Sequence, residues 1–196
     1  MGTDARKVVA DGYPAQNVFA CDLRQEFLDY GHRLYNDAST CGIHFLTANA
    51  FDIPYPPPSD GPTVTDLTST NVTDVSQLRG QVTHLYAGLF FHLFEEAVQY
   101  DLALRLGTLM KRESGSVLYG RQMGAEEPRD VEGTGMFAHN PESWTRMWKK
   151  AFTELESAEF AENRVVVKAK FVVPEEKNIV KLDVELPVLY WSVQIV

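Results

Sequence analysis

The stretch NVFACDLRQEFLDYGHRLYNDASTCGIHFLTANAFD, residues 17–52, decides which fold is expected for this chain. An apolar run at 18–21 ends on Asp22, a segment with helical periodicity follows, and a second apolar run at 43–48 leads into Asn49. This order predicts half of a nucleotide-binding α/β sheet, in which a ligand lies across the carboxyl ends of the strands. An acid at one strand tip can bind a ribose diol, and a polar side chain at the next can meet an adenine edge.

The segment after Asp22 carries an apolar stripe whose members are four, three and four residues apart: Leu23, Phe27, Tyr30 and Leu34. This spacing is typical of an amphipathic helix. Asp22 is also followed three residues later by a glutamine, a pattern that resembles a capping box. Asp22 therefore has two compatible interpretations, a helix cap and a ribose ligand.

The rest of the chain continues the alternation of strands and helices. A Pro- and Thr-rich loop at 53–73 is expected to be either a flap near the ligand or a plain insertion. The elements expected after it, in chain order, are a strand at 82–87, a helix at 91–111, a strand at 116–119, a charged loop at 121–138, a helix from Asn140 whose buried face is Trp144, Trp148, Ala151 and Leu155, and strand-like segments at 165–171 and 188–195. The last two predict an antiparallel ending on a sheet with helices on both faces.

Composition excludes several classes of protein. The chain has 196 residues, 44% of them hydrophobic, and a formal charge of −9, which argues against nucleic acid or an anionic membrane as a partner. Two cysteines are too few for a disulfide scaffold, and no stretch approaches the roughly 20 apolar residues of a membrane span. We expect one domain in a reducing, cytoplasmic setting, with a small molecule as substrate. The sequence does not define the oligomeric state.

Five segments together resemble class I S-adenosylmethionine-dependent methyltransferases, and among these the fungal secondary-metabolism enzymes that act on meroterpenoid and related natural products. The segments are GTDARKVVADGYPAQNVFACDL (2–23), FLTANAFD (45–52), LRGQVTHLYAGLFFHLF (78–94), GSVLYGRQMG (115–124) and MFAHNPESW (136–144). The resemblance covers most of residues 2–155. It implies a Rossmann-like sheet that is mostly parallel with an antiparallel C-terminal ending, a single methyltransferase-like domain over 1–196, and S-adenosylmethionine as cofactor.

The resemblance also implies a set of cofactor-binding residues. Asp22, with Leu23, corresponds to the acid that binds both ribose hydroxyls. The remaining positions are Asn49, Ala50 and Phe51 at the adenine edge and Ala87 and Gly88 beside the methionine part. The family usually has Asp where this chain has Asn49, and the strand at 82–87 often carries an acid where this chain has Thr83.

The N-terminus departs further from the family pattern. In the family, a strand and a glycine-rich loop precede the first helix, and Gly2-Thr3-Asp4 resembles only the last residues of that loop. We therefore expect an N-terminally truncated domain that lacks its first, central strand, which would lie between the strands at 17–21 and 82–87.

The implied activity is O-methylation of a carboxyl or hydroxyl group on a small hydrophobic natural product. His92 is the candidate catalytic residue, and the candidate substrate-binding residues are Tyr86, Arg121, His139 and Trp144. Each also has a structural interpretation: His92 as a core or capping histidine, His139 as a solvated one, and Arg121 as a partner of the acids at 126–132. No group of His, Cys and acidic residues has metal-ligand spacing.

Three other functions stay open. A catalytically inactive remnant of the fold, or a partner subunit, fits the missing glycine-rich loop. A nicotinamide-dependent oxidoreductase also uses an acid after its second strand, but the antiparallel ending and the absence of a GxGxxG motif argue against it. A binding module with an exposed sheet is disfavoured by the expectation that helices cover both faces.

Overall fold

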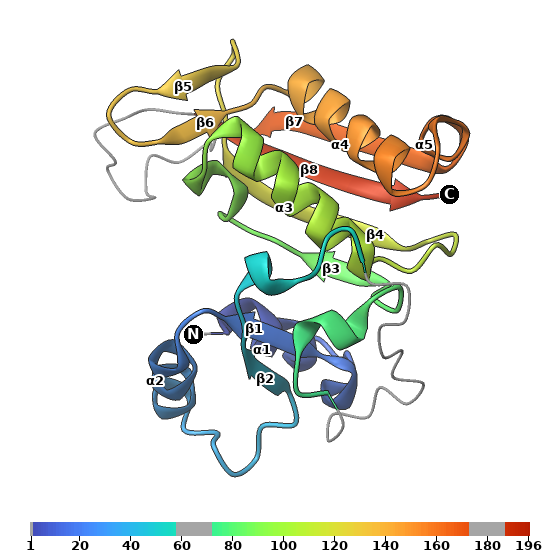
Figure 1. Cartoon of the computed structure of the whole chain (residues 1–196). Helices are drawn as coiled ribbons and strands as arrows, with labels where there is room; N and C mark the ends of the chain where they lie inside the picture. The colour runs from blue at the N-terminus through green and yellow to red at the C-terminus, as the bar shows by residue number, and fades with distance from the viewer. Residues whose placement is uncertain (1, 58–71, 173–186) are drawn as a thin grey trace. The chain divides into compact units, whose positions relative to one another are not determined.

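The structure is a computed structural model that describes residues 2–57, 72–172 and 187–196. The chain divides into two compact units, residues 1–79 and residues 80–196, each of which is described by itself (Figure 1). The expected flap at 53–73 lies largely outside the described residues. The expectation that residues 1–196 form a single domain stays a prediction, as does the missing central strand.

Unit 1 is built around a pair of parallel strands. Its elements are α1 (Thr3–Ala10), the short 3₁₀ helix η1 (Ala15–Asn17), β1 (Phe19–Asp22), α2 (Gln25–Tyr35), β2 (His44–Thr47), η2 (Ala50–Asp52) and η3 (Val75–Leu78). Residues of β1 and β2 pair in register from Phe19 with His44 to Asp22 with Thr47. The strand–helix–strand order expected at 17–52 is confirmed.

The apolar stripe of α2 does not face the core of unit 1. Only Leu28 and Gly31 of this helix are buried. Leu23 lies before the helix, which begins at Gln25 after its cap Arg24, and is 66% exposed; Leu34, at the other end of the predicted stripe, is 65% exposed. The spacing of the stripe correctly predicted an amphipathic helix, but an apolar face usually marks the side that packs on the core, and here it does not.

Unit 2 contains a four-stranded sheet in the order β3-β4-β8-β7. Its elements are β3 (His84–Tyr86), η4 (Phe91–Leu93), α3 (Glu96–Leu109), β4 (Val117–Met123), β5 (Arg129–Val131), β6 (Met136–Ala138), α4 (Pro141–Leu155), α5 (Ala158–Arg164), β7 (Val165–Val172) and β8 (Val188–Ile195). β3 and β4 are parallel, whereas β4–β8 and β7–β8 are antiparallel. The antiparallel ending is confirmed.

Helix α4 begins where the sequence indicated. The Asn140 side chain accepts a hydrogen bond from the backbone N–H of Ser143 at 2.8 Å, and Pro141 occupies the first helical position. Trp144 and Trp148 are fully buried on its inner face. They contact aromatic side chains of η4 and β8, so this end of the sheet is covered by an aromatic core.

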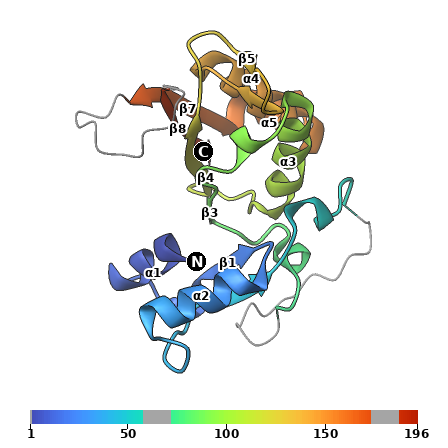
Figure 2. The ribbon, with the colours of Figure 1, turned by 90° about the vertical axis from the view of Figure 1, so that its left-hand side faces the viewer.

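Three expectations for unit 2 are corrected. Helix α3 begins at Glu96 rather than at residue 91, because the chain first makes the separate turn η4. The loop expected at 121–138 instead contains the end of β4 and the antiparallel hairpin β5–β6. Helices α3, α4 and α5 lie on one side of the sheet (Figure 2), whereas the tyrosines on its other side stay 36–41% exposed: Tyr86, Tyr119 and Tyr190.

Candidate functional site

Asp22 ends β1 and leads the chain into α2. Its carboxylate accepts a hydrogen bond from the backbone N–H of Arg24 at 3.0 Å. Arg24, and not Asp22, is the residue that caps α2, and its side chain makes no capping hydrogen bond. The capping-box interpretation is therefore wrong in detail: Asp22 stabilises the turn before the helix and remains at the carboxyl end of the strand.

Asn49 lies just beyond the end of the neighbouring strand. The two chains stay paired up to this point, because the Ala48 N–H donates to the Asp22 carbonyl at 2.9 Å. Asn49 has extended backbone (φ −102°, ψ 124°) and lies two residues beyond Thr47, the partner of Asp22. Standard strand spacings then put the Cα atoms of Asp22 and Asn49 roughly 8 Å apart, with both side chains on the same side of the strand pair.

The amide of Asn49 also shapes the following turn. Its side-chain oxygen accepts a hydrogen bond from the Phe51 N–H at 3.1 Å and so starts η2. A carbonyl oxygen can accept two hydrogen bonds, and the amide NH₂ group can donate two more. Ala50 and Phe51 are half-buried in this turn.

In unit 2, the predicted methionine-site residues follow β3. The Ala87 N–H donates to the Tyr119 carbonyl at 2.9 Å, which extends the pairing with β4 by one residue. A side chain at Gly120 would overlap the Ala87 carbonyl oxygen, and one at Gly88 would overlap the Tyr86 hydroxyl. Glycine is therefore needed at position 120, where the obstructing atoms are backbone, whereas at position 88 the obstruction is the outer end of the exposed Tyr86 side chain.

His139 and Trp144 come together in the aromatic core of this unit. Their ring centroids are 5.3 Å apart, and Trp144 lies 5.1 Å from Phe91 and 4.9 Å from Trp191. His139 is 1% exposed and its Nδ1 lies 2.9 Å from the Ser143 hydroxyl. The interpretation of His139 as a solvated histidine is wrong.

Several buried polar atoms around this core have no hydrogen-bond partner among the described residues. They are His92 Nδ1, His139 Nε2, both amide atoms of Gln122, and the indole nitrogens of Trp144, Trp148 and Trp191. Each such atom costs about 1–3 kcal/mol unless water or a ligand satisfies it. The buried polar groups thus give this region unused hydrogen-bonding capacity.

Burial also changes the titration of both histidines. It lowers the pKa of His92, and together with the nearby Arg146 charge it lowers the pKa of His139 to about 4. At neutral pH both imidazoles are therefore uncharged, the state in which a histidine can accept a proton.

Strand alternation separates the acceptor-side candidates into two groups. Gln122 is buried on the helix-covered side of β4, so Arg121 points to the other side. Tyr86 lies on that second side as well, with its ring 5.4 Å from that of Tyr119. The structure thus brings together His139 and Trp144, but not these two with Tyr86 and Arg121.

Gln122 and Trp191 are two residues of this region that sequence reasoning missed. Gln122 fell in a segment expected to be a loop, and Trp191 fell in a tail that was read only for its strand pattern. Their alternation with Leu118 and Val193 on paired strands is the signal that could have placed them on the same face.

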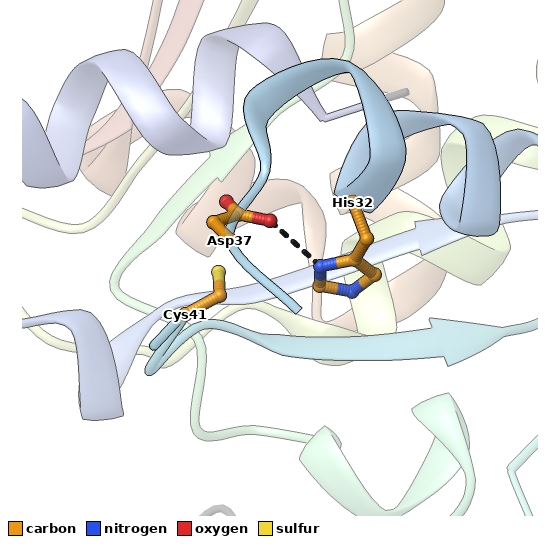
Figure 3. Close-up of side chains that lie close together, drawn as sticks. All are labelled: His32, Asp37 and Cys41. Atoms are coloured by element: carbon orange, nitrogen blue, oxygen red, sulfur yellow. Dashed lines mark hydrogen bonds and ion pairs between the residues drawn. The ribbon is translucent and has the colours of Figure 1, made fainter. Parts of the chain in front are cut away.

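A separate cluster in unit 1 has metal-ligating side chains: His32, Asp37 and Cys41, whose ligand atoms lie within 4.8 Å of one another (Figure 3). This group was not expected from the sequence. The Arg6 guanidinium already binds both oxygens of Asp37, at 2.6 and 3.1 Å, and lies 3.3 Å from His32 Nδ1. A cation therefore sits where a metal would, and the cluster acts as an ion-pair network that joins α1 to the end of α2.

No protein-family model matches the chain. It is 29% identical to O-methyltransferase phiE of a fungus (strain ATCC 74256) over 158 residues, which are 79% of this chain and 47% of that protein. It is 29% identical to methyltransferase adrK of Penicillium roqueforti over 157 residues, which are 78% of this chain and 50% of that protein. The chain thus spans about half the length of these curated relatives.

Among solved structures, the chain resembles the Burkholderia thailandensis 1,6-didemethyltoxoflavin-N1-methyltransferase with bound 1,6-didemethyltoxoflavin and S-adenosylhomocysteine. The TM-score is 0.59 at 10% identity, over 99% of this chain and 66% of the other. The chain therefore has the Rossmann-like α/β fold of S-adenosylmethionine-dependent methyltransferases, and its sequence is similar to those of fungal methyltransferases, as the sequence analysis expected.

Proposed function

We propose that the chain belongs to an S-adenosylmethionine-dependent methyltransferase that methylates a carboxyl or hydroxyl oxygen of a small hydrophobic natural product. The observation that carries this proposal is the position of Asp22 and Asn49 at the carboxyl ends of two paired parallel strands. Ligands of open α/β sheets bind at this edge. The similarity to fungal methyltransferases supports the same conclusion.

The cofactor fits the chemistry of the residues present. The Asp22 carboxylate, with Leu23 beside it, can accept hydrogen bonds from the two ribose hydroxyls, because among the described residues only the Arg24 backbone N–H donates to it. Asn49 can pair with the adenine edge beside Ala50 and Phe51. For the methionine part, the candidates are Ala87 and Gly88. When bound, S-adenosylmethionine supplies a methyl group that is electrophilic at carbon.

On the acceptor side, the chain has to position an oxygen and exclude water. A carboxylate acceptor needs only donors that orient it, whereas a hydroxyl acceptor also benefits from a base. His92 is the candidate base, and its lowered pKa keeps it neutral at pH 7. Tyr86, Arg121, His139 and Trp144 are the candidates for binding the acceptor.

The proposal includes the expected partners and location. The substrate is a small molecule, and neither nucleic acid nor a membrane is a partner. Among the described residues, no helix combines the length and apolarity needed to cross a bilayer. We propose a cytoplasmic setting, in which Cys21 and Cys41 stay as free thiols.

Calorimetric titration of the 196-residue chain with S-adenosylmethionine tests the cofactor assignment. We expect micromolar binding that weakens about 30-fold in Asp22→Asn, because charge-assisted hydrogen bonds contribute roughly 1.5–3 kcal/mol. Asp11→Asn is the matched control, since this acid is exposed at the end of α1 and, among the described residues, its ion pair is an exposed one with Lys7. Binding that is equally strong in wild type and Asp22→Asn would refute the role of Asp22. No binding by the wild-type chain would favour the catalytically inactive alternative.

A further inference from the structure

Gln99 is a polar side chain that is fully buried near the start of α3. Its Nε2 atom donates one hydrogen bond to the Phe94 carbonyl and another to the Phe137 carbonyl, each at 2.8 Å. An amide nitrogen carries two N–H donors, whereas an amide oxygen can only accept, so the two carbonyls fix which end of the amide faces them. We call Gln99, Phe94 and Phe137 the Gln99 joint.

The two carbonyls of the joint belong to segments that are far apart in sequence and lie side by side. Phe94 ends η4 just before α3, and Phe137 is the central residue of β6 (Figure 1). The Phe137 N–H also donates to the Phe94 carbonyl, at 3.0 Å. In an antiparallel strand, the N–H and C=O of one residue point to the same side. The Phe137 carbonyl therefore points away from β5, and Gln99 binds the edge of β6 that β5 does not use.

Each carbonyl of the joint is two residues away from a candidate histidine. His92 lies in η4, two residues before Phe94, and His139 follows β6, two residues after Phe137. Both imidazoles are buried, and each has a ring nitrogen without a hydrogen-bond partner among the described residues, Nδ1 in His92 and Nε2 in His139. Because no hydrogen bond at these atoms holds the rings, the backbone that Gln99 joins contributes to where they lie.

Stability alone does not explain why this buried residue is a glutamine. The Gln99 Oε1 atom has no partner among the described residues, and a buried acceptor without a partner opposes folding. An apolar side chain would avoid that cost, but it could not donate to either carbonyl. What the amide supplies, and an apolar residue could not, is a directional link between η4 and β6.

We propose that Gln99 is a positioning residue for the acceptor side of the methyl-transfer site, because its amide joins the two segments that carry His92 and His139. This inference rests on the proposed function, in which His92 is the candidate base and His139 a candidate for binding the acceptor. Methyl transfer depends on alignment: reacting atoms must lie about 3–3.5 Å apart, and a displacement of about 1 Å can lower the rate roughly 100-fold. Gln99 acts through the two histidines.

NMR spectroscopy of the full chain, labelled with ¹³C and ¹⁵N in its five histidines, tests the proposal. Gln99→Met keeps an unbranched side chain of similar length and removes both donors. We expect this variant to shift the ring signals of His92 and His139. It should also lose the NOEs from the His139 ring to Phe137 and Trp144, whose ring centroids lie 4.8 and 5.3 Å away in the wild type. The signals of the other three histidines should not move.

Thr108→Val is the matched control. Thr108 is also a buried polar residue of α3, and its hydroxyl donates to the Arg105 carbonyl within the same helix, at 2.7 Å. This variant should lower stability without moving any histidine signal, which is also what Gln99→Met would do if Gln99 only stabilised the fold. Circular dichroism checks that each variant is folded. Histidine signals and NOEs that stay as in the wild type in folded Gln99→Met overturn the proposal.

Gln99→Glu decides the question if Gln99→Met does not fold. A protonated carboxyl keeps the shape of the amide but offers one O–H donor in place of two N–H donors. At about pH 5.5, where burial keeps this carboxyl protonated, the NOEs of the His139 ring should be weaker than in the wild type, and NOEs of full strength overturn the proposal. These measurements need neither cofactor nor acceptor, so a chain that does not bind S-adenosylmethionine would refute the proposed function and leave this test intact.

Discussion

At the scale of single residues, the buried His139 makes the stability of unit 2 depend on pH. Its ring is 1% exposed, and burial together with Arg146 lowers its pKa to about 4. In the unfolded chain, the same imidazole titrates near 6.5. Below that pH the unfolded state binds a proton that the folded state does not, so falling pH favours unfolding.

We therefore predict that the free energy of unfolding of unit 2 is constant above about pH 7 and falls by up to ~3 kcal/mol between pH 6.5 and 4 through this histidine. Urea titrations followed by tryptophan fluorescence measure it. His139→Gln should flatten this pH dependence, whereas His84→Gln, at an exposed position, should not. Equal pH dependence in wild type and His139→Gln would contradict the prediction.

In unit 1, the single residue that contributes most clearly to stability is Arg6. Its guanidinium binds Asp37 through two atoms and lies over the rings of Tyr35 and Phe45, at 4.7 and 4.9 Å. These contacts hold the pKa of the Asp37 carboxyl well below its usual range, chiefly through the hydrogen bond from Arg6. Lysine cannot reproduce either the planar fork or the stacking.

Arg6→Lys should accordingly lower the free energy of unfolding of unit 1 by about 1–2 kcal/mol. Far-UV circular dichroism during urea denaturation measures the change. Arg24→Lys provides the comparison, since Arg24 lies over the Phe27 ring and pairs with Glu26 only at the exposed surface, where such contacts contribute little. If both substitutions had the same effect, the Arg6 network would not be the stabilising feature that its geometry indicates.

At the scale of secondary structure, sequence patterns predicted element types better than element partners. Asn140-Pro141 marked a helix start because capping chemistry is local, and the structure has the same cap. The spacing of Phe27, Tyr30 and Leu34 on α2 is also local, but which face of a helix packs inward depends on surfaces far away in sequence. The hairpin β5–β6 was missed because its strands have only three residues each and β5 contains two charged side chains.

The residues of the candidate site likewise fall into two groups, those that local patterns placed correctly and those whose neighbours depend on pairing between distant segments. The tip positions of Asp22 and Asn49 followed from strand ends, and the parallel pairing of β1 and β2 puts them side by side. The proximity of Trp144 to Trp191 depends on β8 pairing with β4, which no local pattern indicates. The grouping of His32, Asp37 and Cys41 depends on the path of a loop and was equally hidden.

Gly120 offers a test of how β4 shapes the end of β3. Its missing side chain leaves room for the Ala87 carbonyl and the Trp191 ring, and the obstructing carbonyl belongs to the backbone and cannot swing away. Gly120→Ala should destabilise unit 2 by about 2–4 kcal/mol and shift the tryptophan emission. Gly42→Ala, where an added methyl group meets only the Ala15 side chain at 3.1 Å, should leave the emission unchanged. Wild-type stability in Gly120→Ala would show that β3 can move aside.

At the scale of the whole molecule, apolar burial is divided unequally. Of the described buried apolar side chains, 6 lie in unit 1 and 22 in unit 2. Unit 2 also holds all three tryptophans, each at most 4% exposed. Because burial of apolar surface is the main favourable term in folding, unit 2 should be the more stable of the two.

Urea denaturation of the wild-type chain should therefore show two transitions. Tryptophan fluorescence reports only on unit 2, whereas far-UV circular dichroism reports on the helices of both units. We expect the circular dichroism signal to begin its loss at lower urea, as α1 and α2 unfold, and the fluorescence to change later. Hydrogen exchange of residues 3–35 against 96–109 gives the same comparison without denaturant. Coincident transitions by both probes, with equal protection of the two segments, would instead mean that the chain unfolds as one cooperative body.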